Sequence, residues 1–147
     1  MYELIKLAKN NITNKIRFCG HASPDDLIHE MFIVHPKDMY VRPHKHVNKS
    51  ESMLVLNGEV DYILFNQDGD IEEVIELGDF NSKKDFYIST KEQTYHSLII
   101  KSEWLVFLEI TSGPFKKEDT IFAKWSPDIN DISEIEKYVN ELKKAIK

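Results

Sequence analysis

The chain has 147 residues, enough for one domain with a hydrophobic core. Hydrophobic residues make up 41% of the sequence and charged residues 30%, a balance that argues against a disordered or low-complexity protein. The formal net charge is −6, and the basic residues are interspersed with acidic ones. We therefore expect no nucleic-acid partner, because binding to a phosphate backbone requires a concentrated basic face.

No stretch reaches the length of a membrane span, and the first residues lack the apolar core of a signal peptide. We therefore expect a cytoplasmic protein with no membrane partner. Cys19 is the only cysteine, so no disulfide can form within the chain. Its surroundings, "RFCGHA", match no known pattern of a catalytic cysteine, so we expect Cys19 to be a small buried hydrophobic residue.

The first predicted element is a short amphipathic helix over residues 2–11, where apolar residues recur at helical spacing. The dipeptide Asn57–Gly58 predicts a β-hairpin between the strands on its two sides, and residues 67–70 predict a second hairpin. Short apolar or alternating runs predict strands at 30–36, 38–44, 51–56, 59–65, 71–77, 86–89, 94–100 and 104–110. Short strands at such close intervals favour an antiparallel sandwich or barrel.

The last predicted element is an amphipathic helix over residues 131–147, with apolar residues at three- and four-residue steps. Asp131 or Ser133 is expected to cap its start, and basic residues near its end complement the helix dipole. No linker or internal repeat divides the chain. The sequence therefore predicts a single all-β domain spanning residues 1–147, with a helix near each end.

Three histidines and a glutamate form a candidate metal site. His44 and His46 point to the same face of a strand, because side chains alternate. The turn-forming residues 47–50 reset this alternation, so Glu51 can open the next strand facing the same way. His96 shares a face with apolar residues of another strand. Two neighbouring histidines alone are more often a surface pair than a metal site, so the prediction depends on all four residues together. Imidazole and carboxylate ligands suit Fe, Mn, Ni or Zn, and the sequence does not select among these ions.

Two segments resemble the cupin motifs. "HKHVNKSESMLVLNG" is similar to the first motif, with His44, His46, Glu51 and Gly58 at the motif positions. "YISTKEQTYHSLII" is similar to the second motif, whose histidine is His96, although its usual proline, glycine and asparagine are replaced. The resemblance implies a cupin double-stranded β-helix, a jelly-roll-like barrel, with these three histidines and the glutamate as metal ligands.

A narrower resemblance extends from about residue 17 to residue 128. "YVRPHKH", "NGEVDYILFNQDGDI", "LEITSGPF" and "IFAKWSPD" are similar to the WbuC-type cupin fold metalloproteins, which occur with bacterial O-antigen and other surface polysaccharide biosynthesis. The barrel is then expected at about 28–112, and a C-terminal extension and helix at about 113–147. This helix is expected to cover an open edge or to join a partner chain. The chain departs from the family where Thr111 and Ser112 replace a usual lysine.

Further residues are candidates for chemistry beside the metal. Arg42 shares the inward face of the two motif histidines and is expected either to bind a carboxylate or phosphate or to pair with an acid such as Glu109 or Glu30. His21 is expected either to act as an acid or base near the barrel mouth or to lie in solvent. The full set of candidates is Glu51, His21 and Tyr40 for catalysis and Arg42, Arg17 and His29 for substrate binding.

The resemblance supports several functions. The first is a metal-dependent isomerase or epimerase that acts on a sugar or nucleotide sugar in surface polysaccharide biosynthesis, with a metal-dependent oxygenase as a variant. The second is a non-catalytic cupin that binds metal and a small-molecule ligand such as a sugar. The third is a structural barrel whose site has decayed. We also expect a homodimer, because exposed sheet edges need to be covered.

Overall fold

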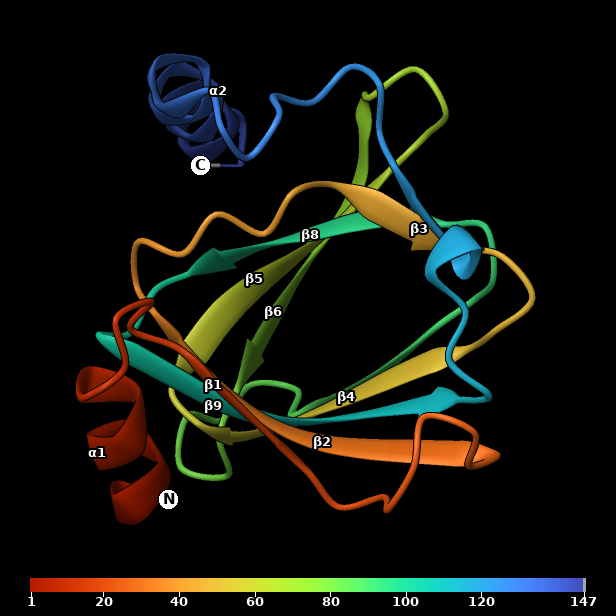
Figure 1. Cartoon of the computed structure of the whole chain (residues 1–147). Coiled ribbons are helices and arrows are strands. Elements are labelled where there is room, and N and C mark those ends of the chain that lie inside the picture. The colour runs from red at the N-terminus through yellow and green to blue at the C-terminus, as the bar shows by residue number, and fades with distance from the viewer. Residues whose placement is uncertain (147) are drawn as a thin grey trace.

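The computed structural model describes residues 1–146, which form two five-stranded sheets and two α-helices (Figure 1). The elements in chain order are α1 (Tyr2–Lys9), β1 (Ile16–Cys19), β2 (Ile28–Pro36), β3 (His44–His46), β4 (Glu51–Asn57), β5 (Glu59–Phe65), β6 (Ile71–Gly78), β7 (Tyr87–Thr90), β8 (Tyr95–Ile100), β9 (Trp104–Ser112), a 3₁₀ helix (Lys117–Asp119), β10 (Thr120–Phe122) and α2 (Ile132–Ala145). The expected all-β class with a helix near each end is confirmed.

The two sheets face each other across one apolar core. Sheet A has the strand order β1-β2-β9-β4-β7 and sheet B the order β10-β3-β8-β5-β6, and neighbouring strands pair antiparallel. Alternate residues of each strand point inward, so both sheets contribute to the core. The buried core residues are Met31, Ile33, Met53, Val55, Val60, Tyr62, Leu77, Leu98, Ile100, Leu105 and Phe107.

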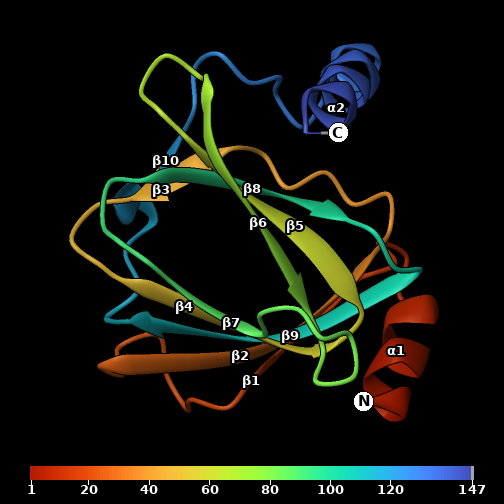
Figure 2. The same cartoon turned by 180° about the vertical axis from the view of Figure 1, so that it is seen from behind.

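Each helix covers the outer face of a different sheet (Figures 1 and 2). Ala8 of α1 is buried against Val34 and Val106 of sheet A. Leu142 of α2 is buried in a cluster with Ile63 of sheet B. The predicted C-terminal helix therefore covers a sheet face rather than an edge. No helix within residues 1–146 combines the length and hydropathy needed to cross a membrane.

The start of α2 is fixed by its capping residue. Of the two residues expected to cap this helix, Asp131 occupies the N-cap position, and its side chain accepts a hydrogen bond from the backbone N–H of Glu134 at 3.2 Å. The carboxylate satisfies one of the free N–H groups in the first helical turn. Ser133 lies inside the helix and donates a hydrogen bond to Asp131.

The hairpin predicted at Asn57–Gly58 is wrong. β4 ends at Asn57 in sheet A, whereas β5 begins at Glu59 in sheet B, so the chain crosses between the sheets at Gly58. The inward residues of the two strands, such as Val55 of β4 and Tyr62 of β5, belong to the same core between the facing sheets. The second predicted hairpin is confirmed, because β5 pairs with β6.

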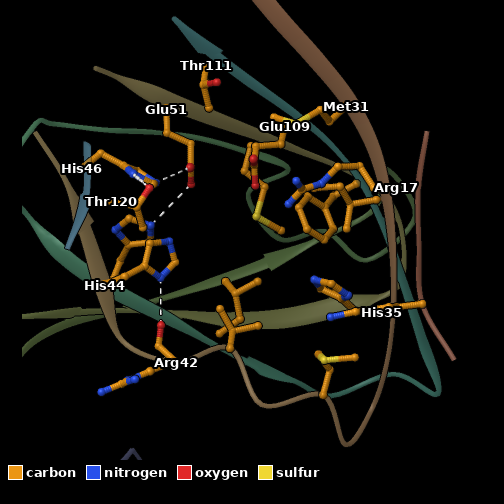
Figure 3. Close-up of a pocket in the computed structure, with 18 of the residues that line it drawn as sticks. Arg17, Met31, His35, Arg42, His44, His46, Glu51, Glu109, Thr111 and Thr120 are labelled. Carbon is orange, nitrogen blue, oxygen red and sulfur yellow. Dashed lines mark hydrogen bonds and ion pairs between the residues drawn. The ribbon is translucent and has the colours of Figure 1, made fainter. Parts of the chain in front are cut away.

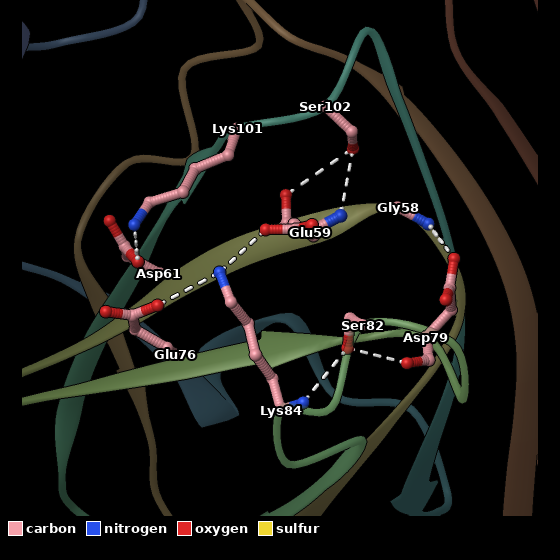
Figure 4. A network of polar contacts seen from close by, with 9 residues as sticks. All are labelled: Gly58, Glu59, Asp61, Glu76, Asp79, Ser82, Lys84, Lys101 and Ser102. Atoms are coloured by element: carbon pink, nitrogen blue, oxygen red, sulfur yellow. Dashed lines mark hydrogen bonds and ion pairs between the residues drawn. The ribbon is translucent and has the colours of Figure 1, made fainter.

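Gly58 is required at this crossing by its backbone and its neighbours (Figure 4). Its φ angle is +96°, and a Cβ atom would collide with the side chain of Ser102 and the carbonyl oxygen of Trp104. Its N–H donates to Asp79 Oδ2 at 3.1 Å, and the N–H of Glu59 donates to Ser102 Oγ at 3.0 Å. Hydrogen bonds to side chains thus replace those of a hairpin turn.

Three further sequence predictions differ from the structure. The strand predicted at 38–44 is paired only from His44 onward, and Pro43 before it has no N–H to donate to a neighbouring strand. Cys19 is exposed rather than buried, because it lies at the end of the edge strand β1. The short strands β1 and β10 were not predicted, and both lie outside the range 28–112 expected for the barrel.

Candidate metal centre and its cavity

Three strands bring the candidate ligands together. His44 and His46 lie on β3, His96 on the neighbouring β8, directly opposite His44, and Glu51 begins β4 in the facing sheet. One nitrogen or oxygen atom of each side chain lies within 4.8 Å of the corresponding atoms of the others. Residues 47–50 carry the chain from sheet B to sheet A, which is how Glu51 comes to face the histidines. The cluster gathers four ligand atoms of the types that bind a transition metal.

The histidine rings are held with Nε2 toward the cluster. His44 Nδ1 lies 2.8 Å from the carbonyl oxygen of Arg42, and His96 Nδ1 lies 3.0 Å from that of Thr94. A carbonyl can only accept, so in both rings Nδ1 donates, and the neutral ring has a free lone pair on Nε2. Such contacts to the outer nitrogen are typical of histidines that bind metals.

His46 is oriented in the same way by a different partner. Its Nδ1 lies 3.2 Å from Thr120 Oγ1 of β10, and its Nε2 lies 2.9 Å from Glu51 Oε2. Thr120 pairs directly with His46 in the strand register, so the short strand β10 positions this contact. The C-terminal extension therefore takes part in building the site.

Burial controls the charge of the cluster. Burial lowers the pKa of His44 to about 4, so this ring is neutral at pH 7. Burial raises the pKa of Glu51, but the hydrogen bond with His46 and the neighbouring His96 lower it more, and the result lies well below the usual range. Glu51 is therefore ionised. With neutral imidazoles, the four ligands carry a single negative charge, which suits a divalent cation.

The buried His96 provides a test of whether a metal ion fits. Its side chain is 3% exposed, and its Nε2 lies 3.4 Å from Glu51 Oε1 without making a hydrogen bond. A buried ring nitrogen without a partner is costly. The ring is fixed on its other face by Tyr62, which stacks on it with the ring centroids 5.5 Å apart. A cation among the four ligands would satisfy this nitrogen, so the residues fit the metal that the cupin motifs imply.

A cavity of about 370 Å³ extends from the cluster between the two sheets (Figure 3). Of the residues predicted from the sequence, Arg17, His29, Tyr40 and Arg42 line it together with the four candidate ligands. His21 is not among its lining residues. That side chain stacks on His29 at a centroid distance of 4.2 Å, and its Nδ1 lies 3.2 Å from the backbone of Glu30.

Arg42 and Tyr40 are both attached to the C-terminal extension. Arg42 forms an ion pair with Asp128 at 2.7 Å, so its acidic partner is neither Glu109 nor Glu30. The hydroxyl of Tyr40 donates to the carbonyl oxygen of Pro127 at 3.1 Å. These contacts hold the segment before α2 against the barrel.

Two polar residues of the cavity wall were not among the predicted site residues, although Glu109 was expected as a possible ion partner of Arg42. Glu109 of β9 and His35 of β2 both line the cavity. Glu109 lies at two-residue spacing from Phe107 and Leu105, which are buried on the same face of β9. His35 lies two residues from Ile33, which is buried on the same face of β2. A charged or titratable residue at an inward position of an apolar strand is a signal that the sequence does carry, because inward positions repeat every second residue.

Comparisons with solved structures identify the fold. The protein SO0799 from Shewanella oneidensis matches with a TM-score of 0.63 and 9% identity over 82% of each chain. An uncharacterized conserved protein with a double-stranded beta-helix domain from Klebsiella pneumoniae has a TM-score of 0.57 and 15% identity, over 75% of this chain and 80% of that chain. KdgF from Halomonas sp. has a TM-score of 0.54 and 15% identity, over 71% and 83%. The expected cupin double-stranded β-helix is confirmed.

Sequence comparisons place the chain more narrowly. No curated protein matches the sequence. The similarity to the WbuC-type cupins stays a prediction, as does the homodimer. One family model matches residues 1–77, more than half of the chain, and the protein therefore belongs to the family described as "Domain of unknown function (DUF6016)".

Proposed function

We propose that this protein binds one divalent first-row metal ion through His44, His46, Glu51 and His96 and acts on a sugar as a metal-dependent isomerase or epimerase. The observation that carries the proposal is the buried cluster itself, in which two backbone carbonyls and Thr120 fix the three rings with Nε2 toward one carboxylate. A bound ion would supply a Lewis acid that polarises a carbonyl group of the substrate.

The proton transfer of the proposed reaction would depend on a residue of the cavity wall. Isomerisation or epimerisation moves a proton between a carbon atom of the substrate and the protein. Glu109 is the carboxyl group of the cavity wall outside the ligand set. Burial raises its pKa to about 8, so it holds a proton at neutral pH and can exchange it with a bound molecule. Apolar side chains such as Met31 and Met53 keep bulk water from this part of the cavity.

The wider role that we propose is in bacterial surface polysaccharide biosynthesis. It is supported by the similarity of four sequence segments to the WbuC-type cupins. The cavity opens between the sheets and is lined by both apolar and polar groups, which suits a small polar molecule such as a sugar.

The first experiment measures metal content. Elemental analysis of the purified protein, and of protein loaded with Mn²⁺, Fe²⁺, Ni²⁺ or Zn²⁺, should find close to one ion per chain. The double variant His44→Ala/His46→Ala should lose it, whereas His21→Ala, which removes a histidine outside the cavity lining, should keep it. Wild-type protein that takes up none of the four ions would contradict the proposal.

The second experiment tests turnover. The metal-loaded protein is incubated in D₂O with aldoses, ketoses and nucleotide sugars, and NMR follows deuterium incorporation at carbon. Isomerases and epimerases that move a proton exchange it with solvent, so incorporation that requires both metal and Glu109 supports the proposal. A stoichiometric metal ion without exchange or turnover on the whole panel would instead indicate the non-catalytic binding protein.

A further inference from the structure

One wall of the cavity carries three polar side chains that do not belong to the metal cluster. Arg17, His35 and Glu109 lie together at the end of the cavity away from His44 and His46 (Figure 3). Glu109 pairs with Met53 in the strand register, two positions along β4 from Glu51. Such diagonal neighbours on one sheet face lie roughly 7–8 Å apart. A ligand of a few carbon atoms can therefore reach from the metal ligands to this group.

The polar atoms at this end lack partners within the protein. Within residues 1–146, neither Arg17 nor Glu109 forms an ion pair or a side-chain hydrogen bond, and the buried Nδ1 atom of His35 has no hydrogen-bond partner. Arg42, the other arginine of the cavity, is instead occupied by Asp128. The buried Nδ1 atom of His35 is a polar atom that a ligand would satisfy, and the exposed Arg17 beside it is free to contact the same ligand.

The charge at this end is not balanced by the protein. Burial raises the pKa of Glu109 to about 8, and burial lowers the pKa of His35 to about 4, with Lys15 and Arg17 adding to the effect. Both groups are therefore neutral at pH 7, when Arg17 is positively charged. Arg17 therefore adds a positive charge beside two neutral hydrogen-bonding groups, and Lys15 and Lys49 also line the cavity, so this end suits a negatively charged group on a ligand.

The arginine side chain and the cavity volume indicate the class of ligand. A carboxylate accepts two hydrogen bonds from the guanidinium fork of arginine. The cavity volume of about 370 Å³ is at the lower end of the roughly 300–1,000 Å³ of small-molecule sites. It suits a monosaccharide rather than a whole nucleotide sugar.

We propose that this end of the cavity binds the carboxylate of a monosaccharide-sized sugar acid, with Arg17 as its ionic partner and His35 as a hydrogen-bonding group, so that Glu109 remains available for the proton transfer proposed above. The sugar hydroxyl or carbonyl oxygens then extend toward the metal cluster. The inference names the substrate class of the proposed sugar enzyme and rests on that function for the second contact. The carboxylate contact itself requires only Arg17 and His35, so it can be measured without metal.

Isothermal titration calorimetry at pH 7 with EDTA tests the carboxylate contact separately from the metal. The probes are D-glucuronate, D-glucose as its neutral counterpart and glucose 6-phosphate as the phosphate counterpart. Wild-type protein should bind glucuronate at least tenfold more tightly than either counterpart. Arg17→Met should lose at least tenfold in glucuronate affinity, and Arg17→Lys, which keeps the charge without the fork, should lose less. Lys6→Met removes a positive charge from α1, outside the cavity, and should leave the affinity unchanged.

The outcomes distinguish this inference from the proposed metal function. Protein that binds metal stoichiometrically but does not prefer glucuronate would overturn the inference and leave the metal function intact. Glucuronate binding that depends on Arg17 in a protein that takes up no metal would support the inference alone. Equal affinity in wild type and Arg17→Met, or tighter binding of glucose 6-phosphate, would overturn it. Circular dichroism melts of each variant establish that the variants are folded.

Discussion

Loss of a single ligand should abolish most of the stabilisation that a metal ion confers, and His96→Ala is the sharpest such change. His96 is 3% exposed, and its Nε2 faces the cluster without a hydrogen-bond partner, so it contributes to the site mainly when a cation is bound. Its removal takes one of four ligands from the ion. The remaining three side chains keep their own hydrogen bonds to Arg42, Thr120 and each other.

The size of the effect follows from linkage. A metal ion present at about 100 times its dissociation constant stabilises the folded protein by about 2.7 kcal/mol. The unfolding entropy of a chain of 147 residues is about 0.3 kcal/mol per degree, so this stabilisation by metal should raise the melting temperature by about 9 °C. Loss of a group that hydrogen-bonds to a metal ligand weakens metal binding by about 10–100-fold. Loss of the ligand itself should weaken metal binding by at least about 100-fold. At the same metal concentration the rise in His96→Ala is then about 1 °C.

The assay is thermal unfolding followed by circular dichroism, with EDTA and with each metal ion. Thr120→Val removes only the hydroxyl that contacts His46 Nδ1, and it should give an intermediate rise in melting temperature. His21→Ala serves as the control histidine and should respond like wild type. Equal metal-induced rises in wild type and His96→Ala would show that the ion binds elsewhere and would refute the reasoning.

Three further predictions concern the fold and the cavity. Burial raises the pKa of Glu109 from its ordinary value of 4.5 to about 8 in the folded protein, so wild-type stability is lost as pH rises through this window. Glu109→Gln in EDTA should therefore gain melting temperature relative to wild type between pH 5 and pH 8, and a constant difference would contradict the raised pKa. Gly58→Ala should destabilise the protein by more than about 1 kcal/mol in urea unfolding, because φ is +96° and a Cβ meets Ser102; an unchanged midpoint would mean that the crossing adjusts freely. Leu142→Ala should cost about 2 kcal/mol or more in the same assay, because this side chain attaches α2 to sheet B, whereas a cost near zero would show that the helix is not stably docked.

The sequence predicted most elements and the ligand set because both depend on local patterns. A two-residue period places Glu51, Met53 and Val55 on one buried face, and these residues are buried in β4 as expected. The spacing from His44 to Glu51 needs only a turn between two strands. The start of α2 could be predicted from its capping residue, because Asp131, one of the two candidates, occupies the N-cap position. The first helix ends at Lys9, two residues before the predicted end.

Apart from the β5–β6 hairpin, only the tertiary structure decided which strands are neighbours. The Asn57–Gly58 turn is typical of a hairpin, yet it joins strands of opposite sheets, whose inward residues share one core. Strand pairing also decided which residues line the cavity. Arg17 and Glu109 are separated by most of the barrel in sequence, and they line the same cavity because β1 and β9 both pair with β2 in sheet A. Periodicity determines which way a side chain points in its own strand, whereas strand pairing, which is non-local, determines what that side chain meets.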